Sequence, residues 1–247
     1  SQGVSLLLNS FFGTIVNAAR GIAMQVSSAI QNFSSNIAVA FSPQIVNAIA
    51  SEDNQRAERL MFTESKICYT LLLIIAVPLC LEMDYVLRLW LGKNIPEQTN
   101  IFSILMLADA VLCTLNTPCT QVTLATGRIK AYEIGSTTVN LCLIPICYIF
   151  LVLGFNATSS FVITIVFSAI LQLICLYFAH KELRFHLGAY VKKVLLPCMA
   201  ITIMLPILPY ITKQYMSTTF ARLTLVCLID IFTAIPLTFF ILLDEKE

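Results

Sequence analysis

The chain is a series of long apolar runs separated by short polar links. A membrane-crossing helix requires about 20 apolar residues, and most of the runs approach or exceed that length. The pattern predicts eight helical segments, the first of them incomplete. They cover residues 5–16, 18–50, 67–91, 100–126, 131–153, 159–179, 194–211 and 220–243. The longest polar link is residues 51–66, and prolines inside several segments are expected to kink or end those helices.

The second segment is the most polar of the eight. Amide, hydroxyl and basic residues are frequent within it and just before it, among them Asn17, Arg20, Gln25, Ser28, Gln31, Asn32, Ser35, Asn36, Gln44 and Asn47. Steps of three and four residues join Gln25, Ser28, Asn32 and Asn36, so these four share one helix face. Such residues either form hydrogen bonds between packed helices or line a water-filled cavity. The density of amides on one helix favours the cavity.

Arg20 is the most informative single residue of this segment. A cation at membrane depth is costly and usually faces a cavity or a partner, and the planar guanidinium suits phosphate because it meets two oxygens at once. The alternative is that Arg20 lies at the membrane interface and extends its charge to the headgroups. The sequence leaves both interpretations open.

Two carboxylates lie within apolar runs. Asp109 follows an apolar stretch that begins at Ile101, and Asp230 follows residues 223–229. Each is either a protonatable, ion-coupling group or a protonated side chain that bonds to a neighbouring helix, and the coupling role is favoured for Asp109. Glu82 and Asp84 fall where a segment ends, so we expect both to be in water.

Composition fixes the class of protein. Hydrophobic residues make up 58% of 247 and charged residues 12%, against about 25% charged in soluble domains, and the mean hydropathy is +0.85. We therefore expect an all-α, polytopic transmembrane helix bundle: one membrane domain over residues 1–247, of seven to eight segments, with no soluble domain. The net charge of +1 offers no basic patch for nucleic acid.

Enzyme and metal signatures are absent from the sequence. The nine cysteines are scattered in apolar runs without a CxxC pair, and two histidines cannot form a metal site. No catalytic or nucleotide-binding motif occurs. We expect no cofactor and no metal, with coupling to H⁺ or Na⁺ as the only ionic requirement.

Basic residues alternate between the two sides of the predicted membrane domain. Ten lie in one set of links, around Arg56, Arg128, Lys181 and Lys246, and five lie in the other set, around Arg88 and Lys213. Cytoplasmic links carry the excess of Lys and Arg. The pattern predicts a multi-pass protein with a cytoplasmic C-terminus.

Several motifs resemble those of one transporter family. They are the run from Ser1 to Gly13, the stretch Asn17-Ala18-Ala19-Arg20-Gly21, Ser42-Pro43-Gln44, Leu89-Trp90-Leu91-Gly92 and Ala125-Thr126-Gly127-Arg128. In this order they look like the middle and later part of bacterial polysaccharide flippases of the Wzx type, in the multidrug/oligosaccharidyl-lipid/polysaccharide exporter superfamily. Thr14 and Ser42 depart from the residues common in that family.

The resemblance implies the C-terminal lobe of a two-lobed transporter in the bacterial cytoplasmic membrane. An N-terminal lobe would be missing, and the chain would flip polyprenyl-pyrophosphate-linked oligosaccharide by alternating access for surface polysaccharide assembly. The expected cavity residues are Asn9, Asn17, Arg20, Gln25, Asn32, Asn36 and Gln44. Arg20 would neutralise pyrophosphate, the amides would bind sugar or phosphate oxygens, and Asp109 would couple an ion.

Two alternatives remain open at the level of the sequence. A cation-coupled multidrug exporter of the same superfamily predicts a cavity dominated by acids and aromatics. A membrane-embedded polysaccharide polymerase or glycosyltransferase predicts a large loop or a soluble catalytic domain with acidic motifs.

Overall fold

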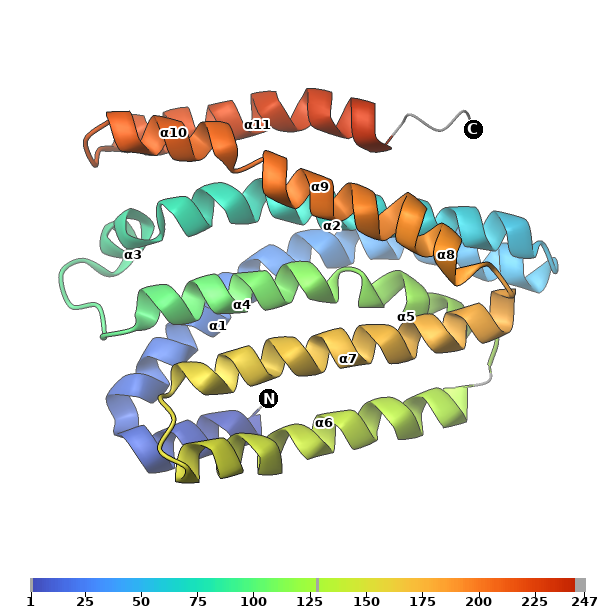
Figure 1. Ribbon diagram of the computed structural model, residues 1–247, viewed down its shortest axis with the longest axis horizontal. Helices are drawn as coiled ribbons and strands as arrows, with labels where there is room; N and C mark the ends of the chain where they lie inside the picture. The colour runs from blue at the N-terminus through green and yellow to red at the C-terminus, as the bar shows by residue number, and fades with distance from the viewer. Residues whose placement is uncertain (1, 128, 243–247) are drawn as a thin grey trace.

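The computed structural model describes residues 2–127 and 129–242, and these residues form helices and turns without a strand. The all-α class is confirmed. The helices are α1 (Gln2–Ala50), α2 (Asn54–Leu81), α3 (Met83–Leu91), α4 (Thr99–Cys113), α5 (Asn116–Ala125), α6 (Ile129–Val152), α7 (Thr158–Leu183), α8 (Leu187–Tyr190), a π-helical turn (Val191–Leu195), α9 (Leu196–Met204), α10 (Ile207–Tyr215) and α11 (Phe220–Leu242). In Figure 1 the long helices run side by side along one axis.

Seven helices or helix groups of the described chain are long and apolar enough to cross a membrane. They are Gln2–Ala50, Asn54–Leu81, Thr99–Ala125, Ile129–Val152, Thr158–Leu183, Leu187–Tyr215 and Phe220–Phe239. A multi-pass membrane protein is therefore supported. The predicted first and second segments are joined in α1, which accounts for the difference from eight.

The predicted polar link over residues 51–66 is wrong for most of its length. Asp53 caps α2, and its carboxylate accepts a hydrogen bond from the backbone N–H of Arg56 at 3.0 Å. An N-cap of this kind satisfies a donor that the first helical turn leaves free. The helix consequently begins at Asn54, thirteen residues before the predicted start at Ile67.

α1 contains a sharp kink at Gly13, four residues before the predicted boundary at Asn17. Gly13 has φ 81° and ψ −173°, a backbone region that is essentially restricted to glycine. The short N-terminal part of α1 therefore runs back against the bundle while the rest of the helix crosses it (Figure 1).

Prolines explain two other interruptions. Pro118 lies in the first turn of α5, where its ring excludes the carbonyl of residue 114 from a continuous helix, and the chain breaks between α4 and α5 at Thr114–Leu115. The predicted segment 194–211 is longer and more broken than expected. It runs from α8 to α10, with a π-helical turn before Pro197 and a break at Pro206.

α2 is the central helix of the bundle. It contacts α1, α4, α5, α7, α9, α10 and α11, and its residues Met61, Leu72 and Ala76 belong to the main buried apolar cluster. A second cluster lies where the N-terminal part of α1 meets α4, α6 and α7, and it contains the stacked rings of Phe102 and Phe161. The two clusters fix the relative positions of α1, α4 and α7, which frame the candidate site.

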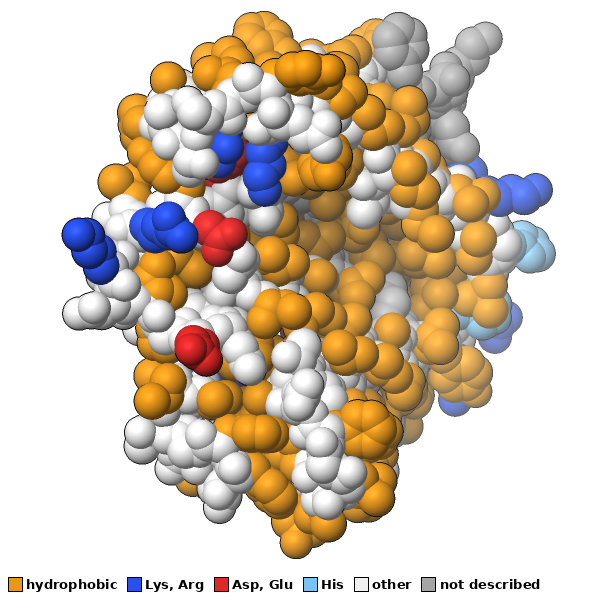
Figure 2. Space-filling model, turned by 60° about the vertical axis from the view of Figure 1, so that its left-hand side comes forward, with side chains coloured by type: hydrophobic (Ala, Val, Ile, Leu, Met, Phe, Trp, Pro, Cys, Tyr) orange, Lys and Arg blue, Asp and Glu red, His pale blue; other side chains and the backbone are white. Residues whose placement is uncertain are grey.

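The surface separates apolar and charged groups. Hydrophobic side chains cover the broad middle of the face in Figure 2, and the charged side chains gather toward two opposite ends. The turn between α1 and α2, next to Arg56, and the link between α7 and α8, which carries Arg184, lie at one end of the bundle (Figure 1). The link between α3 and α4, which carries Lys93, and the link between α10 and α11, next to Arg222, lie near the other end. This placement agrees with the predicted alternation. Arg128, Lys246 and the C-terminus lie outside the described residues, so the cytoplasmic side stays a prediction.

Candidate functional site

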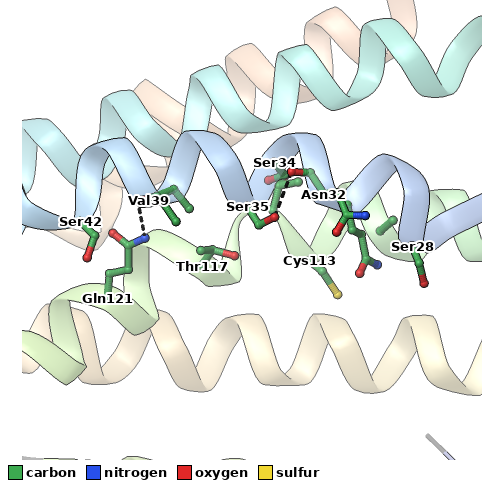
Figure 3. Close-up of a pocket in the computed structure, with 13 residues that line it drawn as sticks. Ser28, Asn32, Ser34, Ser35, Val39, Ser42, Cys113, Thr117 and Gln121 are labelled. Carbon is green, nitrogen blue, oxygen red and sulfur yellow. Dashed lines mark hydrogen bonds between the residues drawn. The ribbon is translucent and has the colours of Figure 1, made fainter.

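A polar cavity of about 600 Å³ lies between the second half of α1 and the α4–α5 segment. Figure 3 shows Ser28, Asn32, Ser35 and Ser42 along α1, with Cys113, Thr117 and Gln121 from α4 and α5 beside them. The complete lining is Ser28, Gln31, Asn32, Ser34, Ser35, Ala38, Val39, Ser42, Ala110, Cys113, Thr114, Thr117 and Gln121. The cavity is thus built from the most polar helix and from the broken one.

The lining is polar and carries no charge. Six of the thirteen residues contribute hydroxyl groups and three contribute side-chain amides, and none is Asp, Glu, Lys, Arg, Phe, Tyr or Trp. Hydroxyls and amides each provide both donors and acceptors. The site can therefore hydrogen-bond a neutral ligand that has many polar groups, and it offers no counter-ion to a charged one.

The break between α4 and α5 contributes to the polarity of the cavity. Thr114 and Thr117 flank it, and both line the cavity. The Thr114 hydroxyl donates to the Val111 carbonyl at 2.7 Å and so covers one of the backbone groups at the end of α4. Irregular backbone at membrane depth occurs where it is buried in protein or faces a water-filled space. The break is consistent with a wet cavity at this level of the bundle.

Asn32 is the predicted cavity residue that the structure places in the lining. The remaining predicted amides lie on α1 outside it. Asn9, Gln25, Asn36 and Gln44 are exposed, and Asn17 is half-buried near the kink. Sequence reasoning missed much of the lining because serines and threonines outnumber amides there, and because the α4–α5 segment supplies five of the thirteen residues.

Arg20 is buried, with 5% of its surface exposed, beside the second apolar cluster. Its guanidinium donates to the hydroxyl of Ser5, across the kink at Gly13. The side chain does not line the cavity. In this conformation Arg20 therefore joins the two parts of α1, and contact with a phosphate would require the kinked segment to move.

Asp109 lies on α4 immediately before the cavity residue Ala110 and is half-buried. Its carboxylate accepts a hydrogen bond from the Ser168 hydroxyl of α7 at 2.6 Å. Cys113, one turn further along α4, lines the cavity and donates its thiol to the same hydroxyl at 3.8 Å. Asp109 is thus close to the cavity wall but turned toward α7.

The structure reveals a buried acid that sequence reasoning missed. Glu64 on α2 is 0% exposed, and neither carboxylate oxygen has a hydrogen-bond partner. A signal was present in the sequence, because steps of three or four residues place one set of residues on a single helix face. The set is Ala57, Met61, Glu64, Cys68 and Leu72. Recognising that face required knowing that α2 begins at Asn54.

The prediction for Glu82 is also wrong. Glu82 is 2% exposed and forms an ion pair with Arg222 of α11, at 2.6 Å between Oε2 and Nη2. Asp84 is exposed, as predicted, and accepts a hydrogen bond from the Asn100 amide at 2.6 Å. Asp230 on α11 resembles Glu64, because it is 0% exposed and both its oxygens lack a partner.

Among the described residues, no group of three or more His, Cys, Asp or Glu side chains is arranged to hold a metal ion. Comparison of the chain with protein-family models, with curated proteins and with solved structures finds no match.

Proposed function

We propose that this chain forms one lobe of a membrane transporter that passes the sugar headgroup of a lipid-linked oligosaccharide across the bacterial cytoplasmic membrane. The observation that carries the proposal is the uncharged cavity of hydroxyl and amide groups within an otherwise apolar helix bundle. An oligosaccharide is neutral and presents hydroxyl groups in many directions, so it matches donors and acceptors that are similarly spread. A polyprenyl tail would remain in the lipid beside the apolar surface.

The size and position of the cavity agree with this function. About 600 Å³ lies within the range of pockets that enclose small ligands. On α1 the lining continues from Ser28 to Ser42, roughly 20 Å at 1.5 Å per residue. A cavity of that length along the helix axis provides successive hydrogen-bonding positions for a headgroup that moves along the membrane normal.

The proposal includes a second lobe opposite α1. Gln25, Asn36 and Gln44 project from α1 outside the cavity and are exposed, where a facing lobe would enclose them together with the lining residues. Rocking of the two lobes would then open the cavity to each side in turn. Arg20 would meet the pyrophosphate after movement at Gly13, and Asp109 would couple the movement to H⁺ or Na⁺.

The two alternatives receive less support. A multidrug exporter of the same superfamily was expected to have acids and aromatics in its cavity, and the lining contains neither. A polymerase or glycosyltransferase was expected to carry a large loop or a catalytic domain. The links between the described helices are short, and the seven residues from Gly92 to Gln98 form one of the longer ones.

The proposal can be tested by blocking the cavity in the producing bacterium. Ser35→Trp places an indole in the lining, whereas Phe33→Trp places the same group on an exposed position of α1 two residues earlier, outside the lining. We expect Ser35→Trp to abolish surface polysaccharide and to cause lipid-linked oligosaccharide to accumulate in the inner leaflet. We expect Phe33→Trp to retain most of the wild-type level of surface polysaccharide.

A binding measurement on the purified protein separates sugar recognition from lipid recognition. We expect lipid-linked oligosaccharide to bind more tightly than polyprenyl pyrophosphate without sugar, and Ser35→Trp to remove that difference. Normal surface polysaccharide in Ser35→Trp, or equal binding of the two lipids to the wild type, would contradict the proposal.

A further inference from the structure

Glu64 occupies an unusual position for a carboxyl group. It lies in the middle of the bundle on α2, with none of its surface exposed. Cys68 on the same helix and Cys119 and Gln121 on α5 are the side chains that interact with it. Neither Glu64 oxygen accepts a hydrogen bond. The neighbouring Ser65 hydroxyl donates to the Met61 carbonyl at 2.8 Å instead.

An ionised carboxylate is strongly unfavourable at this place. Burial of an unpaired charge costs several kcal/mol even after the protein relaxes. Among the described residues, the titratable groups that face Glu64 are the thiols of Cys68 and Cys119, and no Lys, Arg or His faces it. Lys66, two residues further along α2, lies near Cys198 of α9 instead. Glu64 is therefore neutral in this conformation and carries a proton.

Gln121 stands between this carboxyl and the cavity. Its side chain lines the cavity, and its amide nitrogen donates to the Ala38 carbonyl of α1 at 3.1 Å (Figure 3). Its amide oxygen is buried and has no donor. The Gln121 side chain interacts with the Glu64 carboxyl, and neither this amide oxygen nor the carboxyl oxygens have a donor. A proton on Glu64 supplies the donor that both groups lack.

We propose that Glu64 is a proton-binding site that loads and unloads through the polar cavity, with the Gln121 side chain as its movable cover. Rotation of Gln121 away from Ala38 opens Glu64 to cavity water, and the proton passes from the carboxyl to that water, which leaves a carboxylate. The charged form requires hydration, so it favours separation of α1 from α5 at this point. The protonated form favours the closed contact.

The proton site itself does not depend on the proposed function. Its use in transport does rest on that function, because proton occupancy would then set how far α1 and α5 open around the headgroup. Asp230 provides a matched control. It is equally buried and equally unpartnered, but it lies on α11, which contributes no residue to the cavity.

Infrared difference spectroscopy of the purified full chain in lipid nanodiscs tests the site without a transport readout. We expect a carbonyl band of buried, protonated carboxyl groups at neutral pH. Glu64→Gln should remove one component of this band, and Asp230→Asn should remove another. Carbon-13 labelling of the glutamate carboxyls shifts the Glu64 component in the wild type, so the assignment survives if a variant does not fold.

Exchange into D₂O tests the cover. Gln121→Ala removes the hydrogen bond to Ala38, and we expect the Glu64 component to exchange roughly two- to tenfold faster, the range allowed by loss of one such bond. The Asp230 component should keep its wild-type rate. The proposal is overturned if the glutamate label shifts no protonated band, or if Gln121→Ala leaves the Glu64 exchange rate unchanged. Either result leaves the cavity-blocking test of transport unaffected.

Discussion

The ion pair between Glu82 and Arg222 connects the junction of α2 and α3 to the first turn of α11. The side chains are 1% and 9% exposed, respectively, and one hydrogen bond of 2.6 Å joins them. Arg222 also donates from Nη1 to the Met216 carbonyl at 3.1 Å. Arg222→Met removes the cation, keeps much of the side-chain volume and leaves the buried Glu82 carboxylate without its ion-pair partner.

The expected cost of this change is large. Removing one partner of a buried ion pair destabilises proteins by about 3–5 kcal/mol. A second cation, Lys213, donates to the adjacent Leu81 carbonyl at 2.5 Å, so part of the charge of Glu82 remains balanced. We therefore expect Arg222→Met to lower the free energy of unfolding by about 3 kcal/mol, the lower end of that range.

Two further variants turn this expectation into a double-mutant cycle. Glu82→Gln keeps an acceptor for the guanidinium and leaves a cation that is 9% exposed, so we expect a smaller loss of about 1.5–3 kcal/mol, the worth of a hydrogen bond to a charged group. The double variant Glu82→Gln/Arg222→Met contains neither charge. We expect it to be more stable than Arg222→Met alone, because the desolvation of both ions is avoided.

The unfolding free energies can be measured by denaturant titration in mixed micelles. Trp90 is the single tryptophan of the chain and lies on α3, the helix that follows the junction with α2. Its fluorescence therefore reports the unfolding of this part of the protein. A loss below about 1 kcal/mol for Arg222→Met, as for a solvent-exposed pair, would refute the reasoning. So would a double variant whose loss equals the sum of the two single losses, because additivity means that the two side chains are not coupled.

Three other changes have defined outcomes. Gly13→Ala should lower the free energy of unfolding by about 1–3 kcal/mol, because Gly13 has a positive φ that other residues adopt only with strain. Gly21 lies on the same helix with open space for a methyl group, so Gly21→Ala should be neutral or stabilising in the same denaturant titration. Phe102→Ala should lower the free energy of unfolding by about 3–5 kcal/mol, because the ring is fully buried. Phe33 is exposed, so Phe33→Ala should lower it little, and thermal unfolding of the two variants distinguishes these outcomes. Asp109→Asn keeps an acceptor for its Ser168 bond. It should leave oligosaccharide binding unchanged and lower the dependence of transport on an ion gradient, measured in proteoliposomes.

The fold class was predictable because the membrane constrains it so strongly. Runs of apolar residues with few charges have one stable backbone solution in lipid, the helix, and the number of spans follows from counting the runs. The boundaries were less accessible. Asp53 is one of several polar residues in its stretch, so the sequence does not single it out as a helix cap. The sequence also does not distinguish Gly13, which has a positive φ, from a glycine in an ordinary helical conformation.

The polar cavity lies along the helix for which the sequence predicted one, and Asn32 belongs both to the predicted set and to the lining. At 100° per residue, Asn36 lies about 80° round α1 from Ser28, whereas Ser42 lies only about 40° away on the other side. The lining follows this second direction, because α4 and α5 pack there. Contacts between segments that are distant in sequence decide which side of a polar helix face packs against a neighbouring helix. The residue pattern of one helix does not predict these contacts.

The length of α1 has a consequence for how the protein sits in its bilayer. Beyond Gly13 the helix continues to Ala50, about 55 Å at 1.5 Å per residue, whereas the hydrocarbon layer is about 30 Å thick. Tilt absorbs a part of this mismatch, and the remaining turns project through the headgroups with the start of α2. Arg56 and Arg59 lie on that projecting hairpin together with Glu52, Asp53 and Glu58, and because charged side chains are costly in hydrocarbon, this hairpin keeps the junction of α1 and α2 in the water beside the bilayer.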